Sequence, residues 1–180
     1  MTTQRKKILA ISGSTRKFSA NESILKYIAE YYKEKLDVEF FDGIDKLPHF
    51  NPDLDNENPP DSIKHFRSQI EQADGILICT PEYVFSIPGS LKNAIEWNVS
   101  TTLFSNKPVA FIVASASGEK AFESLDLVMT TIESKMTKNS KLLIQGVKGK
   151  IRKDGKINDQ KTIDGINLLL KSFVETIEER

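Results

Sequence analysis

The sequence has few of the residues that mark secreted or membrane proteins. It contains one cysteine, Cys79, so no disulfide can form within the chain, and this favours a reducing compartment. The N-terminal MTTQRKK leads into an apolar run of about six residues, too short for a signal peptide core or a membrane span. We therefore expect a cytoplasmic protein without membrane association. We also expect Cys79, inside an apolar run, to be a buried small hydrophobe rather than a catalytic thiol.

The sequence also lacks an excess of either charge. Lysine plus arginine and aspartate plus glutamate number 25 each, which argues against a general electrostatic attraction to nucleic acid. The two histidines, His49 and His65, have no cysteine or histidine at ligand spacing, so no zinc site is predicted. The acidic stretch 53–61 is interrupted by prolines and lacks the EF-hand pattern, so we expect a solvated connection there.

One local excess of positive charge interrupts this balance. Basic residues cluster near the C-terminal third without interleaved aromatic residues, so a solvated basic face is favoured over nucleic-acid binding. A nucleic-acid-binding module remains an alternative, and attraction of an anionic small molecule is a weaker hypothesis. The cluster comprises Lys135, Lys138, Lys141, Lys148, Lys150, Arg152, Lys153 and Lys156, with only Asp154 opposing them in that span.

Apolar runs of strand length alternate with helical patterns along the whole chain. Strands are expected at 7–12, 37–42, 74–81, 107–115 and 141–146, and helices at 24–36, 63–72, 86–97, 121–136 and 163–177. This order predicts a single α/β domain, residues 1–180, with a flavodoxin-like three-layer sandwich and a five-stranded parallel sheet of order 2-1-3-4-5. Such folds bind ligands beyond the carboxyl ends of their strands, which places a site on the loops 13–21, 80–88 and 115–120.

The first of these loops, in ILAISGSTRKFSAN, carries several small polar side chains between a strand and a helix. Gly13 permits a tight turn, Ser14, Ser19 and Asn21 offer neutral donors, and Arg16 offers a planar guanidinium. Because a helix N-terminus favours an anion, this set predicts a cradle for a phosphate monoester. The loop is neither a Walker A nor a G-x-G-x-x-G motif. The alternative is ordinary helix capping, with Arg16 in a solvated turn.

The second loop carries the most informative motif of the chain. The segment TPEYVFSIPGSLKNAIEW, residues 80–97, resembles the NADPH-dependent FMN reductase family, whose hallmark is P-E-Y-N-x-S-I-P-G-x-L-K-N-A-I-D-W. The G-S-x-R of the first loop, with its later serine and asparagine, also resembles the phosphate loop of that family. The element order fits over nearly the whole chain, and so does the tail, with a turn at 153–156 followed by Asn158 and Asp159.

The resemblance implies a flavoenzyme. FMN is expected to bind non-covalently, NADPH or NADH to act as cosubstrate, and a small-molecule electron acceptor to be reduced by two electrons in a ping-pong scheme. Quinones, azo dyes, nitro compounds, metal ions and free flavin are all possible acceptors. No side chain is expected to act as an acid or base, since the flavin carries the chemistry. The helix expected at 87–97 is implied to form a homodimer or homotetramer.

The same resemblance assigns residues to the cofactor. Its implied FMN-phosphate ligands are Ser14, Arg16, Ser19 and Asn21. Along the ring it implies Pro81, Glu82, Tyr83, Val84, Phe85 and Ser86 on one side and Ser115, Ser117 and Gly118 on the other. In this chain Val84-Phe85 replaces the usual Asn-Gly or Asn-His, which removes an amide and adds a ring. Phe85 is expected to stack on the flavin, to narrow the pocket or to pack at a subunit contact.

Two flavin-binding alternatives to the reductase are also considered. An FMN-dependent electron carrier is disfavoured by the zero net charge, because flavodoxins steer their partners with strong acidity. A flavin-binding sensor without efficient NAD(P)H turnover is compatible with the change at Val84 and Phe85. Trp97, at the end of the motif, is expected to serve packing rather than chemistry.

Overall fold

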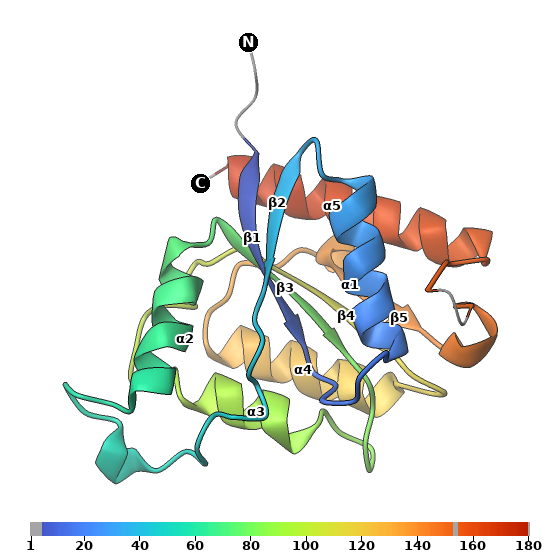
Figure 1. The fold of residues 1–180 in the computed structure, drawn as a ribbon. Helices are drawn as coiled ribbons and strands as arrows, with labels where there is room; N and C mark the ends of the chain where they lie inside the picture. Colours follow the sequence, from blue (N-terminus) through green and yellow to red (C-terminus); the bar gives the residue numbers. More distant parts are fainter. Residues whose placement is uncertain (1–4, 153–154, 180) are drawn as a thin grey trace.

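The computed structural model describes residues 5–152 and 155–179 and contains one five-stranded parallel sheet (Figure 1). The strand order is β2-β1-β3-β4-β5, which confirms the flavodoxin-like prediction. The strands are β1 (Lys6–Ser12), β2 (Leu36–Phe40), β3 (Gly75–Thr80), β4 (Val109–Ala114) and β5 (Lys141–Ile144). The predicted tail turn at 153–156 includes Lys153 and Asp154, which lie outside the described residues.

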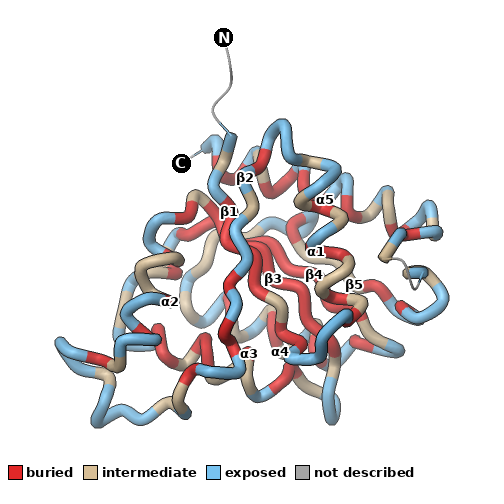
Figure 2. The backbone as a smooth tube through the Cα atoms, in the orientation of Figure 1, coloured by how far each residue is buried: buried red, intermediate tan, exposed pale blue. Residues whose placement is uncertain are grey.

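Within the described residues, five α-helices cover the two faces of this sheet. They are α1 (Ala20–Tyr31), α2 (Asp61–Gln72), α3 (Gly89–Glu96), α4 (Glu119–Thr131) and α5 (Gln160–Glu178), and short 3-10 helices span Pro52–Leu54, Lys138–Ser140 and Val147–Gly149. Helices α1 and α5 pack on one face, and α2, α3 and α4 pack on the other (Figure 1). Strands β3 and β4 are buried along their full lengths (Figure 2), which explains their uninterrupted apolar sequences.

Several helix boundaries differ from those that the periodicity predicts, among them the end of α1, the start of α3 and the end of α4. Leu36, expected on the stripe of the first helix, is instead the first residue of β2. Helix α3 begins at Gly89, because Pro88 has extended backbone (φ −56°, ψ 141°) and is the N-cap residue. Helix α4 ends at Thr131, and Glu133 shortly after it adopts a left-handed backbone with φ 60°. At Pro88 and at Glu133 the helix is limited by backbone conformation, which the polarity of the side chains does not report.

The long proline-rich loop before α2 is attached to the C-terminal end of α3. The indole nitrogen of Trp97 donates to the carbonyl of Pro48 at 2.7 Å, and the side chain of Asn93 donates to the same carbonyl at 3.0 Å. Arg67 on α2 binds the carbonyl of Trp97 and forms an ion pair with Asp55 at 2.6 Å. The Asp55 side chain is only 4% exposed, so the expectation of a purely solvated acidic stretch was wrong for this residue.

Candidate functional site

Three loops meet at the carboxyl edge of the sheet. They follow β1, β3 and β4, which are neighbours in the sheet order, so their ends lie side by side (Figure 1). This edge is where open parallel sheets bind ligands, because helix N-termini and loop backbones converge there. The structure therefore brings together the three segments that the sequence predicts.

The loop after β1 is ordered by short-range hydrogen bonds of serine side chains. The hydroxyl of Ser12 accepts from the Ser14 backbone N–H at 3.2 Å and donates to the Ser14 carbonyl at 3.1 Å. The Ser14 hydroxyl in turn accepts from the Arg16 N–H at 3.3 Å. Ser12 was not among the predicted residues, since a serine at a strand end gives no distinctive pattern. Arg16 is exposed, and the loop holds its backbone in place.

Ser19 begins the helix that follows. Its hydroxyl accepts from the Glu22 N–H at 3.1 Å, and the Glu22 carboxylate accepts from the Phe18 N–H at 3.0 Å. The ammonium of Lys26 also donates to Glu22, and this bond lowers the pKa of the carboxyl below its usual value. The capping interpretation is thus correct for Ser19. The hydroxyl proton of Ser19 is still available to a further acceptor, because the cap uses only an oxygen lone pair.

Gly13 is required by the neighbouring strand. Its N–H donates to the Cys79 carbonyl at 2.8 Å, and a Cβ at this position would lie 2.2 Å from Oγ1 of Thr80 and 3.1 Å from Leu91. Such a contact is far inside van der Waals distance. The first loop can therefore lie against the end of β3 only because this residue has no side chain.

Asn21, in the first turn of α1, points its side-chain oxygen at the sheet. Its Oδ1 accepts from the thiol of Cys79 at 3.3 Å, and the residue is 4% exposed. Cys79 is fully buried, as predicted. Ser14 and Ser19 are buried as well, at 9% and 6% exposure. Three of the four predicted phosphate ligands are thus buried, and only Arg16 is exposed.

The loop after β3 forms a tight hairpin turn. The N–H of Tyr83 donates to the Ser86 carbonyl at 2.9 Å, and the N–H of Ser86 donates back to Tyr83 at 3.1 Å. The central residues Val84 and Phe85 have φ values of 50° and 56°, as a type I′ turn requires. The two residues are 95% and 77% exposed. A β-branched residue in this conformation is strained, and the Asn-Gly of the resembled motif fits it far better.

Glu82 links the second loop to the helix after the third. One of its carboxylate oxygens, Oε2, accepts from the backbone N–H groups of Lys120 and Ala121, both at 3.0 Å. The N-cap of α4 is Gly118, which has no side chain with which to satisfy these donors. The Ser86 and Ser124 hydroxyls, 3.4 Å apart, make a second link. Sequence reasoning missed this capping role because Glu82 is 37 residues before the helix that it caps.

The loop after β4 carries the last three predicted residues. Gly118 has φ 89°, and a Cβ there would lie 2.8 Å from Cδ1 of Leu143, so glycine is required on both counts. Ser115 is half-buried and its N–H donates to the Ile144 carbonyl at 3.1 Å, whereas Ser117 is exposed. The loop thus presents Ser117 at the surface while Ser115 joins it to β5.

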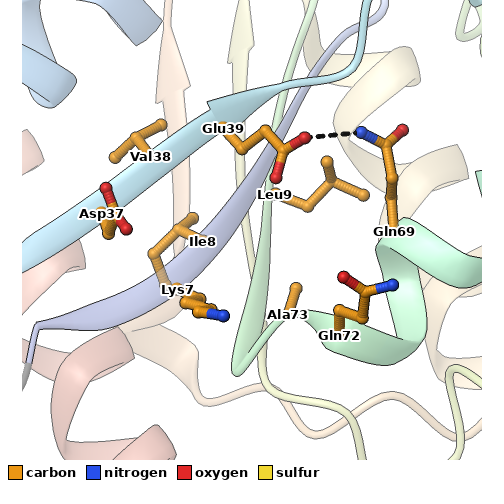
Figure 3. Close-up of a pocket in the computed structure, with 9 residues that line it drawn as sticks. All are labelled: Lys7, Ile8, Leu9, Asp37, Val38, Glu39, Gln69, Gln72 and Ala73. Carbon is orange, nitrogen blue, oxygen red and sulfur yellow. Dashed lines mark hydrogen bonds between the residues drawn. The ribbon is translucent and has the colours of Figure 1, made fainter.

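Two cavities of the structure lie away from these loops. One, of about 380 Å³, is lined by Lys7, Ile8, Leu9, Asp37, Val38, Glu39, Gln69, Gln72 and Ala73 (Figure 3). It lies beside edge strand β2, where Gln69 donates to Glu39 at 2.8 Å. The other, of about 490 Å³, lies between the end of α1 and α5. Neither is formed by the carboxyl-edge loops, so neither is the candidate site.

The described part of the chain holds neither a group of metal-ligating side chains nor a helix suited to span a membrane. No group of three or more histidine, cysteine, aspartate or glutamate side chains is placed to hold a metal ion among residues 5–152 and 155–179. Within the same residues, no helix is both long and apolar enough to cross a bilayer.

Comparison with known proteins decides the family. The model of the NADPH-dependent FMN reductases matches residues 6–146. The chain belongs to the NADPH-dependent FMN reductase family. It is therefore an oxidoreductase of a family that works with FMN and NAD(P)H, as the motif of the second loop predicts.

Several relatives of this FMN reductase family member align with it over almost its whole length. Subunit 2 of an NADH-dependent flavin reductase from Lactobacillus johnsonii is 31% identical, over 96% of this chain and 98% of the relative. A quinone reductase from Escherichia coli K12 is 26% identical over 97% of each. Among solved structures, FerB, an NAD(P)H:acceptor oxidoreductase from Paracoccus denitrificans, superposes with a TM-score of 0.84 at 29% identity. The superposition covers 97% of this chain and 98% of the FerB chain.

Proposed function

We propose that this protein is an FMN-dependent NAD(P)H reductase that transfers two electrons to a small-molecule acceptor in a ping-pong reaction. The acceptor classes that we consider are quinones, azo compounds, metal ions and free flavins. The observation that carries the proposal is the donor-rich loop 13–21. It leads into the N-terminus of α1 beside the hairpin of the second loop, at the edge where this fold binds ligands.

The first loop fits a phosphate group. Ser14 and Ser19 keep their hydroxyl protons, since their oxygens serve only as acceptors in the hydrogen bonds that order the loop. The α1 N-terminus adds a favourable dipole, and the exposed Arg16 adds a positive charge that can reach a phosphate from the surface. We assign the FMN phosphate to Ser14, Arg16, Ser19 and Asn21 on these grounds.

The second and third loops fit the flat ring system. The N–H groups of Tyr83 and Ser86 are used within the hairpin, so we assign the donors for the polar edge of the ring to Val84 and Phe85. Pro81, Glu82 and Tyr83 form the wall on this side, and the opposite side is assigned to Ser115, Ser117 and Gly118. Because Glu82 caps α4, the second loop is joined by hydrogen bonds to the helix that follows the third loop.

Bound FMN would supply the redox chemistry, which is acceptance of a hydride from NAD(P)H and transfer of two electrons to the acceptor. The residues of this chain bind the phosphate, orient the ring and shape the face at which both substrates arrive. No side chain is assigned as a proton donor or acceptor. A homodimer or homotetramer is part of the proposal. Since Leu91, Ala94 and Ile95 of α3 are buried in the core, only the polar side of that helix is available for contact.

A second candidate function is a flavin-binding carrier or sensor with slow turnover. The strained, exposed pair Val84 and Phe85 favours it, because these side chains occupy the segment that forms one wall of the site. A bulky wall restricts access for the nicotinamide more than it restricts the flavin. The experiment below separates the two candidates.

The test is the visible absorbance of the purified protein after incubation with FMN and removal of free FMN, followed by anaerobic addition of NADPH or NADH. The reductase predicts retained yellow colour, rapid bleaching by NAD(P)H and restoration by a quinone. Colour that persists for many minutes after NAD(P)H is added indicates the carrier or sensor. A protein that retains no flavin refutes both functions and leaves the first loop as a helix cap.

A further inference from the structure

The single cysteine of the chain lies beneath the first loop and contacts it directly. Cys79 is next to the last residue of β3, fully buried, on the sheet face covered by α1 and α5. Its Sγ is 3.3 Å from Oδ1 of Asn21, which is in the first turn of α1 and 4% exposed. This contact is a buried polar link between the sheet and the helix N-terminus.

The thiol is a permanent donor in this contact. Burial raises the pKa of Cys79 well above its usual value, so the sulfur remains protonated throughout the neutral range. Its neighbours on the same face include Leu77 and Ile112, which are apolar and fully buried. A carboxamide that faces this sulfur therefore gains a hydrogen bond by presenting its oxygen rather than its nitrogen.

The orientation of the amide matters for an anion. A side-chain amide has one end that only accepts and one end that only donates, and phosphate oxygens bind the donating end. Among the described residues, the structure gives the Asn21 side chain no hydrogen-bond partner except the Cys79 thiol. The thiol is thus the group that selects which end of the amide faces the sheet.

We propose that Cys79 is a positioning residue, whose thiol holds the Asn21 oxygen and so leaves the amide nitrogen to donate to the phosphate of the flavin. This inference rests on the proposed function, because it takes the first loop as the phosphate site. Cys79 itself touches neither the cofactor nor the substrates. It acts through Asn21, and its effect is confined to ligands that carry a phosphate.

The experiment compares the affinities for FMN and for riboflavin, which has the same ring but lacks the phosphate, by quenching of flavin fluorescence. Cys79→Val removes the donor at nearly constant volume, and Cys79→Ser restores a donor. We expect Cys79→Val to weaken FMN binding about tenfold, the scale of one charge-assisted hydrogen bond. Riboflavin binding should stay unchanged, and Cys79→Ser should return FMN affinity to within about twofold of the wild type.

Two further variants test the positioning role of Cys79 separately from the assignment of the first loop as the phosphate site. Asn21→Asp places a negative charge beside the phosphate and should weaken FMN far more than riboflavin. Leu77→Val removes one methylene from the same face of β3, two residues before Cys79, and controls for packing. It should leave the ratio of the two affinities at the wild-type value, with any loss of stability visible in its melting temperature.

The outcomes are distinct. If Cys79→Val changes the two affinities equally, or if Leu77→Val shifts their ratio as much, the thiol serves packing alone and the inference is overturned. If Asn21→Asp weakens FMN more than riboflavin but Cys79→Val does not, the phosphate assignment is supported and the positioning role of Cys79 is refuted. If Asn21→Asp also changes the FMN and riboflavin affinities equally, Asn21 is not at the phosphate. The inference then fails together with that assignment. If the wild type binds no FMN, the proposed function itself is refuted.

Discussion

At the scale of single residues, the site depends on positions where a side chain is absent or turned inward. Gly13 and Gly118 have no functional groups, yet each lets its loop lie against a neighbouring strand. Asn21 is turned toward the sheet and Glu82 toward α4. The residues that a motif comparison assigns to a ligand therefore also hold the loops together, and their substitution affects both roles.

Gly13 offers the sharpest test at this scale. Gly13→Ala would place a methyl group 2.2 Å from Oγ1 of the buried Thr80, so the loop or the strand must move. We expect a loss of about 2–3 kcal/mol in the free energy of unfolding, typical of overpacking in a filled core, together with a loss of FMN affinity. Urea denaturation and flavin titration measure the two effects.

The matched control is Gly89→Ala, at the first position of α3, where an added Cβ would meet nothing within 4 Å apart from its chain neighbours and the backbone of its own helix. Alanine is a better helix former than glycine, so this variant should be neutral or more stable by about 0.5–1 kcal/mol. Equal destabilisation by the two substitutions would contradict the account of the close approach at Gly13.

At the scale of elements, the hairpin turn in the second loop conflicts with its own sequence. A left-handed backbone costs an L-residue about 1–2 kcal/mol, and both Val84 and Phe85 adopt it with little burial in return. The turn is instead held by the two Tyr83–Ser86 hydrogen bonds and by the attachment of Glu82 to α4. Strain that the rest of a structure maintains is a recurrent property of functional loops.

Relieving this strain should stabilise the protein. We expect Val84→Asn and Phe85→Gly each to raise the free energy of unfolding by about 1 kcal/mol, because Asn and Gly tolerate the left-handed region. The same variants should change kcat/KM for apolar quinones, since they remove apolar surface from a wall of the proposed site. Thermal denaturation and steady-state kinetics measure these effects separately.

Val99→Asn is the comparison for this pair. Val99 is also an exposed valine, at 64%, but its backbone does not have a positive φ. Removing its side chain should leave stability within about 0.5 kcal/mol of the wild type. A gain of the same size at Val99 would show that the effect comes from reduced surface hydrophobicity and not from the backbone.

At the scale of the whole molecule, two titratable groups beside the first loop make the stability of the protein depend on pH. One, Glu22, acts at acidic pH and the other, Cys79, at alkaline pH. The folded pKa of Glu22 is lowered, mainly by its hydrogen bond from Lys26, so its contribution is present above the unfolded pKa and is lost as pH falls through the folded value. The pKa of Cys79 is raised by burial, so its contribution is complete below the unfolded thiol pKa and is lost as pH rises above it.

We expect maximal stability between about pH 5 and pH 8. On the alkaline side, Cys79 should cost about 1.4 kcal/mol per pH unit above an unfolded pKa of about 8.5, and Cys79→Val should remove this slope. On the acidic side, Glu22→Gln should reduce the loss of stability below about pH 4.5 by no more than about 1 kcal/mol, since the ion pair is partly exposed. Urea midpoints across the pH range measure both slopes, and parallel curves for wild type and variants would contradict the assignments.

Local patterns in the sequence determined the layers of the fold and the sheet edge at which we propose the site. Continuous apolar strands that alternate with amphipathic helices leave one common sheet order, and the P-E-Y and S-I-P-G residues of the second loop carry the family. These features were predictable because periodicity and motif spacing are properties of short segments.

Only the tertiary structure decided which contacts the individual side chains make within this fold. The capping of α4 by Glu82, the Asn21–Cys79 contact and the buried pair of Arg67 and Asp55 join segments from different parts of the chain. No local pattern encodes such contacts, because they depend on which loops the folded sheet brings side by side. The sequence by itself thus determined the family and the sheet edge at which we propose the site. The packing of three loops at one sheet edge decided which side chains are exposed at that edge and which hold the loops together.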